Sequence, residues 1–295
     1  MGNQKEAEAF TESTDGIPPP PYQEADYSTN VHPPSGPAPS YDVGESSSSI
    51  SGVKCKFPPT LNAYLKMGFT KTLHLGRTKE SPALAARMHS GLTKNPELVL
   101  YDGPSEKGSI LATADHESIW KSNSILTVPA REGVDHDSES QKVIMTSHRS
   151  LRHQTYRFTA NVGVGKETRR EEFEWRSSHG SEVRELDGYR WGWKLVRLSS
   201  QTVGSGGDRA TRATGSTSDG FEVVAAWAHN NSLSMTKAFK FQLMGSALTG
   251  MLGDRGATLA LISAMRIWAI EMTTSSATAA TATTAATATA AAAAS

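Results

Sequence analysis

The sequence predicts an all-β fold, a closed antiparallel β-barrel built around one central hydrophobic C-terminal helix. Two observations predict it. Through most of the chain, apolar residues recur at every second position in short runs that end at Gly, Pro, Asn, Asp or Ser, as half-buried strands do. Near the C terminus, one helical segment is apolar on every side, so it needs a host that surrounds it. A long antiparallel meander that closes on itself meets both requirements.

At least eleven runs of the sequence are predicted as strands. In one of them, Tyr156, Phe158, Ala160 and Val162 alternate with polar residues and share a face. The runs cover 69–75, 97–101, 109–114, 124–128, 142–146, 156–162, 173–175, 182–186, 193–198, 221–228 and 237–243. Segment 82–89 (PALAARMH) stays open, because its alanines favour a helix whereas its place in the series favours a strand.

The predicted helix lies near 254–272. Asp254 is its predicted N-cap, and twelve of the sixteen residues in 257–272 (ATLALISAMRIWAIEM) are apolar and spread around the whole helix. A helix that spans a bilayer needs about 20 apolar residues, whereas only ten residues separate Arg255 from Arg266. We therefore expect the core of the protein to surround this helix. The charge of Arg266 must then reach the barrel mouth or pair with an acid, and the sequence leaves that choice open.

Two polar ends flank the predicted barrel domain, which covers 53–275. Residues 1–52 hold eight of the fourteen prolines, nine serines and almost no aliphatic periodicity, so we expect this segment to be disordered. It carries eight acidic residues and one basic residue, a net charge of −7. At the other end, 276–295 is almost wholly Ala, Thr and Ser and is predicted to be a low-complexity tail outside the fold.

Charge and cysteine content restrict the partners and the location. The chain balances 30 basic against 30 acidic residues, which gives no reason to expect nucleic-acid binding. The single cysteine, Cys55, cannot form an intrachain disulfide, and the first residues (MGNQKEAEAF) contain no apolar segment typical of a secretory signal. We therefore expect an intracellular protein, cytoplasmic or membrane-peripheral, that is not secreted.

The most specific short motif is a Pro-Pro-x-Tyr sequence formed by Pro19, Pro20, Pro21 and Tyr22. Consecutive prolines preset a polyproline II helix, which WW domains bind between aromatic rings while a second pocket takes the tyrosine. We therefore predict that Pro19, Pro20 and Tyr22 bind a WW-domain protein, such as a ubiquitin ligase. The alternative is a Pro-rich leader that only adds solubility.

The densest basic stretch of the chain suggests a second binding surface. If the strands that flank it pair, its charges gather at one end of the barrel and attract an anionic membrane surface. The residues of this predicted anionic-lipid patch are Arg149, Arg152, Lys166, Arg169 and Arg170. Acidic residues follow directly in 171–174 (EEFE), so a mixed solvated surface is the alternative.

No catalytic residue, cofactor or metal site is predicted. Gly163-Val164-Gly165-Lys166 lacks both the first glycine and the final Ser or Thr of a phosphate loop, so a hairpin turn explains it better. Asp135-His136-Asp137 is the closest approach to a metal-ligand cluster, but solvated loop charge explains it more simply. The chain has no G-x-S-x-G sequence, the elbow that carries the nucleophile in many hydrolases.

Three segments of the chain resemble the tubby C-terminal-like superfamily, which includes tubby domains, phospholipid scramblases and plant LURP-one-related proteins. They are Pro96-Glu97-Leu98-Val99-Leu100-Tyr101, Trp193-Lys194-Leu195-Val196 and Ala264-Met265-Arg266-Ile267-Trp268, within a likeness over 57–272. The sequence is most similar to uncharacterised fungal members. The resemblance implies a barrel of about twelve strands threaded by a hydrophobic C-terminal helix.

The resemblance implies less about function than about fold. The phosphoinositide-binding basic positions of tubby domains have no aligned counterpart here. The segment 244–253, which corresponds to the acidic calcium-binding segment of scramblases, contains no acidic residue. We therefore expect a non-enzymatic adaptor or membrane-peripheral module, in which the barrel binds lipid headgroups or protein and the N-terminal segment docks a WW domain. The alternative is a lipid-handling protein similar to scramblases or LURP-one-related proteins.

Overall fold

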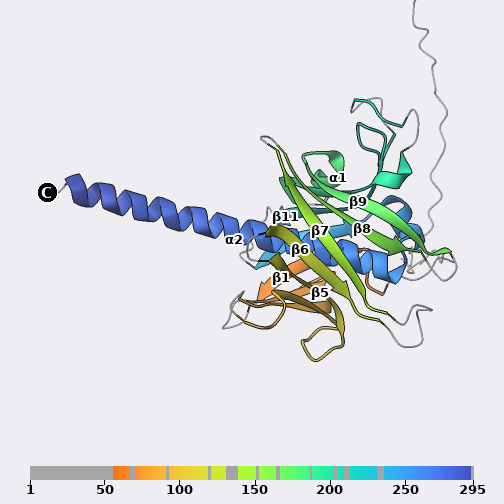
Figure 1. Cartoon of the computed structure of the whole chain (residues 1–295), viewed down its shortest axis with the longest axis horizontal. Helices are drawn as coiled ribbons and strands as arrows, with labels where there is room; N and C mark the ends of the chain where they lie inside the picture. Colours follow the sequence, from red (N-terminus) through yellow and green to blue (C-terminus); the bar gives the residue numbers. More distant parts are fainter. Residues whose placement is uncertain are drawn as a thin grey trace, which may run out of the picture. The chain divides into compact units, whose positions relative to one another are not determined.

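The computed structural model contains one closed barrel of twelve antiparallel strands, which confirms the predicted fold class. It describes residues 56–66, 71–90, 93–118, 121–130, 139–150, 153–163, 167–186, 188–201, 205–208, 213–230 and 236–293. Each strand pairs with its neighbours in the chain, and β1 pairs with β12 to close the barrel. The chain divides into two units, Met1–Ser48 and Ser49–Ser295, and the barrel belongs to the second (Figure 1).

The barrel consists of a simple meander with few additional elements. The strands are β1 (Thr60–Lys66), β2 (Lys71–Gly76), β3 (Pro82–Met88), β4 (Leu98–Asp102), β5 (Ile110–Ser118), β6 (Lys121–Val128), β7 (Gln141–Arg149), β8 (Gln154–Val162), β9 (Arg169–Ser178), β10 (Gly188–Arg197), β11 (Glu222–Asn230) and β12 (Lys237–Leu243). The helices are α1 (Ser181–Arg184) and α2 (Gly253–Ala293), with 3-10 turns η2 (Leu198–Ser200) and η3 (Gly245–Thr249). Because consecutive strands run in opposite directions, successive turns lie at opposite ends of the barrel.

The strand predictions are confirmed except at one segment. Residues 182–186 were predicted as a strand, and this is wrong because they overlap the short helix α1. Val183 and Leu186 are spaced by one helical turn, and both pack outside the barrel against Ala226 and Ala228. The open segment 82–89 forms β3, and β1 is a strand that the periodicity did not predict.

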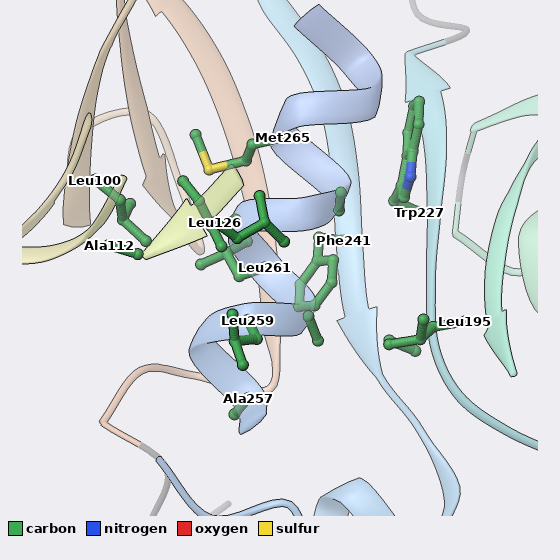
Figure 2. Close-up of a cluster of buried hydrophobic side chains, with 14 of the residues drawn as sticks. Leu100, Ala112, Leu126, Leu195, Trp227, Phe241, Ala257, Leu259, Leu261 and Met265 are labelled. Carbon is green, nitrogen blue, oxygen red and sulfur yellow. The ribbon is translucent and has the colours of Figure 1, made fainter. Parts of the chain in front are cut away.

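The helix α2 fills the centre of the barrel. Every residue from 256 to 269 is buried, so the helix is covered on all sides over this length. It contacts β5, β6, β8 and β12. Figure 2 shows Leu261 and Met265 of α2 among buried side chains of the barrel that include Leu126 and Phe241. The predicted central helix therefore forms the hydrophobic core together with the inner faces of the strands.

The start of α2 is held by backbone contacts with the end of β8. The Gly163 amide donates to the Leu252 carbonyl at 3.3 Å. Gly163 has φ +109° and Gly253 has φ +64°, and a Cβ on Gly253 would collide with the Gly163 backbone. Asp254 lies inside the first turn, so its predicted role as N-cap is wrong. Its carboxylate instead accepts the Lys56 amide at 3.2 Å.

The helix continues well past the segment that the barrel covers. Burial ends at Ala269, and Met272 is 42% exposed, yet α2 is helical to Ala293 (Figure 1). The predicted Ala/Thr tail therefore overlaps a helix, because alanine has the highest helix propensity and an existing helix propagates at low cost. None of the helices in the described part of the chain has the length and apolar character needed to cross a membrane.

The two ends of the barrel are distinct. We name them from α2: the helix begins at the start end, beside Val162, and leaves at the exit end, beside Gln154. Strands with even numbers run from the exit end to the start end, and those with odd numbers run back. The register of the strands therefore decides which polar side chains share an end.

Core packing around α2 makes a first testable prediction. Leu261 is fully buried, so Leu261→Ala removes three side-chain carbons and leaves a cavity. We expect a loss of about 3 to 5 kcal/mol in the free energy of unfolding, measured by urea denaturation. Leu248→Ala is the control, because Leu248 is 57% exposed and its loss should change stability by less than about 0.5 kcal/mol. Equal effects of the two substitutions would contradict the central position of the helix.

Candidate functional site

The buried cation Arg266 marks the candidate site. Its side chain is 3% exposed, although it lies in the core helix. Its Nε donates to Ser124 Oγ of β6 at 2.9 Å, and its Nη1 forms an ion pair with Glu97. Its Nη2 is buried and has no hydrogen-bond partner within the described ranges. Arg266 therefore pairs with an acid at the exit end, which answers the choice that the sequence leaves open.

The strand register brings two further ligand-type side chains to the same point. His116 of β5 lies directly opposite Ser124 of β6. Glu97 immediately precedes β4, and its Oε1 lies 2.5 Å from His116 Nδ1. Asp115 Oδ1 accepts the backbone amide of His116 at 2.8 Å. One ligand atom from each of Glu97, Asp115 and His116 lies within 4.8 Å of the others, and we name these three residues with Arg266 the mouth cluster.

The opposite wall of the exit end holds the helix through Glu271. Trp193 Nε1 of β10 donates to Glu271 Oε1 at 2.9 Å, and His229 Nε2 of β11 lies 2.8 Å from Glu271 Oε2. The rings of His229 and Trp191 also contact each other, with centroids 4.7 Å apart. The helix is thus tied to β6 and Glu97 by Arg266 and to β10 and β11 by Glu271.

A buried tyrosine lies between the contacts that Arg266 makes and those that Glu271 makes. Tyr156 of β8 is 2% exposed, and the centroids of its ring and the Trp193 ring are 5.3 Å apart. Its hydroxyl accepts the Gln154 amide at 2.6 Å. Burial and the nearby negative charge of Glu271 raise the pKa of Tyr156 to about 12. The phenol therefore stays neutral at physiological pH and contributes no charge to the exit end.

The predicted anionic-lipid patch is not brought together by the structure. In the strand register, Arg149 of β7 lies opposite Gln154 of β8 at the exit end, whereas Arg169 of β9 lies opposite Val162 of β8 at the start end. These positions are separated by eight residues of β8, or about 26 Å at roughly 3.3 Å per residue. Arg170 is next to Arg169, and Arg152 and Lys166 lie outside the described residues. Arg149 and Arg169 therefore lie at opposite ends of the barrel, because consecutive turns of a meander lie at opposite ends.

At the start end, Arg169 belongs to a network of charges on the barrel surface. It forms an ion pair with Glu171, whose side chain is 2% exposed. Arg197 of β10 also donates to Glu171, with Nη2 2.7 Å from Oε1. Burial opposes ionisation of Glu171, but the hydrogen bonds from Arg197 and Arg169 outweigh it and hold the pKa below its ordinary value. Arg169 is therefore already paired inside the protein.

Other predicted sites lie outside the described residues. The Pro-Pro-x-Tyr residues Pro19, Pro20 and Tyr22 are among them, as is the loop sequence Asp135-His136-Asp137. The glycine sequence that begins at Gly163 starts the turn between β8 and β9, and 164–166 are not described. A strand, not a helix, follows this turn, unlike the arrangement in a phosphate loop.

Sequence reasoning missed most of the mouth cluster. Glu97 entered only as part of a packing segment, and Asp115 and His116 follow the end of a predicted strand at 109–114. The feature of the sequence that could have revealed them is their position, because all three lie at the same end of neighbouring strands. The alternation of a meander could have placed them together, although the pairing with Arg266 spans 169 residues of sequence.

The buried Glu171 makes a prediction about pH. A depressed carboxyl pKa stabilises the fold above the unfolded-state pKa, and this contribution disappears as pH falls through the folded-state pKa. Glu171→Gln should cost about 1 to 3 kcal/mol at neutral pH and almost nothing in strong acid, measured by urea unfolding across pH. Glu172→Gln is the control, since that side chain is 45% exposed and lies 3.5 Å from Arg157. A pH-independent difference between wild type and Glu171→Gln would contradict this account.

Comparisons with protein-family models, curated proteins and solved structures found no match. The fold class is therefore supported by the strand pairing itself and by the burial of α2.

Proposed function

We propose that the chain is a non-enzymatic intracellular adaptor with a tubby C-terminal-like barrel. The closed barrel of twelve strands and its buried C-terminal helix support this proposal, since they agree with what the family resemblance implies. The barrel holds its own helix where a ligand-binding barrel keeps a cavity. A gap beside α2 has no room for a water molecule, and it is lined by Phe158, Ala160, Val162, Phe173, Leu195, Leu252 and Gly256. Binding is therefore proposed at the surface or through the N-terminal segment.

The observation that carries the proposal is the Pro-Pro-x-Tyr sequence in an acidic, proline-rich segment. Pro19 and Pro20 favour the polyproline II conformation before any partner binds, which lowers the entropy that a WW domain must remove. Tyr22 supplies the side chain for the second pocket of such a domain. The proposed partner is a WW-domain protein, such as a ubiquitin ligase, and the barrel is the folded body that the segment links to it.

A tyrosine substitution tests this function. Tyr22→Ala in the full chain should weaken binding to an isolated WW domain at least tenfold, because the tyrosine pocket is left empty. Tyr41→Ala is a matched control, since Pro39-Ser40-Tyr41 lacks the second proline. Fluorescence polarisation with a labelled WW domain measures both affinities. Undiminished affinity of Tyr22→Ala, or an equal loss in Tyr41→Ala, would exclude docking by this motif.

A lipid-binding function is the second candidate, and one observation favours it. Among the described residues, the exposed cations of the exit end include Lys66, Lys71 and Arg149, and the helix α2 leaves the barrel there. Anionic lipid surfaces attract such basic groups, with about 1 kcal/mol for each charge near the surface. This candidate covers both a membrane-peripheral module and a lipid-handling protein similar to scramblases or LURP-one-related proteins.

Charge reversal at each end of the barrel tests the lipid function. Since the two ends are separated by the length of β8, a membrane that contacts the exit end face does not reach the start end. We expect Arg149→Glu to weaken salt-sensitive binding to phosphatidylserine vesicles about fivefold or more. Arg170→Glu, at the start end, should leave binding unchanged. Sedimentation of the full chain with vesicles at two salt concentrations measures this, and equal effects of the two variants would contradict contact through the exit end.

A further inference from the structure

We propose that Glu97, Asp115 and His116 bind a divalent transition-metal ion of the zinc class at the exit end of the barrel. Two carboxylates and one imidazole form the protein ligands, and the ion keeps one open position for an oxygen ligand. Arg266 is a positioning residue, because it holds Glu97 from inside the barrel. This inference is independent of the proposed WW-domain docking, which involves a different part of the chain.

The distances suit a small cation. The three ligand atoms already lie within 4.8 Å of one another. Zinc binds imidazole nitrogen and carboxylate oxygen at about 2.0 to 2.2 Å, so the ligand atoms of a tetrahedral site are about 3.4 Å apart. Small side-chain shifts reach this arrangement. In the structure Glu97 Oε1 and His116 Nδ1 are 2.5 Å apart, and an ion that enters between them replaces their hydrogen bond.

The chemistry of the ligands favours zinc over calcium. Imidazole nitrogen is a preferred ligand of zinc, copper and nickel, whereas calcium selects six to eight oxygen atoms. Glu97 and Asp115 bring two negative charges and Arg266 brings one positive charge, so a net negative charge remains to attract a cation. The pair of carboxylates therefore supplies the attraction, and His116 supplies the selectivity.

The buried guanidinium is the independent observation that points to a ligand. Arg266 is 97% buried, since its side chain is 3% exposed, and its Nη1 contacts Glu97. The planar fork places Nη2 next to Nη1, and Nη2 has no hydrogen-bond partner among the described residues. A buried donor without an acceptor is destabilising, and an oxygen ligand near Glu97 that reaches Nη2 would remove this penalty. A water or carboxylate oxygen on the metal is such an acceptor.

The ligands combine a fixed carboxylate with an accessible imidazole. Glu97 is held from the core by Arg266, whereas the His116 side chain is 45% exposed and open to solvent. The β5–β6 pairing is irregular between His116 and Ser118, which gives this end of β5 more freedom than a regular ladder has. Such a site exchanges its ion with solvent and uses the barrel to fix one ligand in place.

Titration of the full chain with metal ions tests the proposal. After treatment with a chelator, isothermal titration with Zn²⁺ should show one site, and Ca²⁺ should bind at least tenfold more weakly. His116→Ala and Asp115→Asn should each weaken Zn²⁺ binding at least tenfold. His148→Ala is a matched control, because His148 is an exposed histidine at the same end of the barrel. His136→Ala is a second control, for the acidic loop that the sequence suggested as a ligand cluster.

The positioning role of Arg266 is tested by a measurement that a loss of stability alone does not change, namely the affinity for Zn²⁺. Arg266→Lys keeps the cation but loses the fork, so we expect Zn²⁺ affinity between that of wild type and that of Arg266→Met. Leu261→Ala destabilises the same helix without touching the cluster and should keep the wild-type affinity. Circular dichroism identifies variants that remain folded. If Arg266→Met does not fold, the comparison of Arg266→Lys with Leu261→Ala decides the positioning role.

The outcomes separate clearly. One Zn²⁺ site that His116→Ala and Asp115→Asn weaken, and that both control variants retain, would support the proposal. The absence of Zn²⁺ binding by the wild type would overturn it, as would unchanged affinity in His116→Ala. Loss of binding in His136→Ala instead would place the ion in the acidic loop and would also overturn it. The WW-domain measurement is unaffected by any of these results, so failure of one proposal is distinguishable from failure of the other.

Discussion

Burial of one apolar helix on all of its sides is the constraint on which the structure depends. An open sheet can cover only part of α2, whereas a closed barrel covers residues 256 to 269 completely and leaves no sheet edge unpaired. The few polar groups of the buried segment each need a partner in that interior. Ser263 accepts the indole N–H of Trp175 at 2.8 Å, and Arg266 reaches Ser124 and Glu97. The barrel thus provides the apolar contacts of its core, together with partners for Ser263 and for two of the three side-chain nitrogens of Arg266.

The periodicity of the sequence predicts the fold well because strands and core share one pattern. Inward-facing residues such as Phe158 and Trp175 must be apolar, so alternation is visible without knowledge of the pairing. β1 escaped prediction because its inner positions, Leu61 and Ala63, include only one large apolar side chain before the half-buried Leu65. Residues 182–186 were misread because two apolar residues at helical spacing were counted as part of a strand.

The candidate site was harder to predict because it depends on register and on the end of the barrel to which each residue belongs. Charges that are dense in sequence, such as Arg149 and Arg169, lie at opposite ends because the turns on either side of β8 point in opposite directions. Conversely, Glu97, His116 and Arg266 are far apart in sequence and meet at one point. The alternation of apolar and polar residues predicts which side chains of a strand face the core. It does not predict which residues of other elements lie beside them.

The polar residues of α2 also determine how the helix sits in the barrel. A helix that is apolar all round has no preferred rotation, since every orientation buries similar area. Sliding α2 by one residue would move it by about 1.5 Å and rotate it by roughly 100°. Arg266 would then lose Glu97 and Ser124, and Glu271 would lose Trp193 and His229. An unpaired buried charge costs several kcal/mol, so Arg266 selects one position where the apolar surface alone would permit several. The hydrogen bonds of the half-buried Glu271 favour the same position. The mouth cluster therefore belongs to the mechanism that fixes the core, and a ligand that changed the geometry of Glu97 would act directly on the position of the helix.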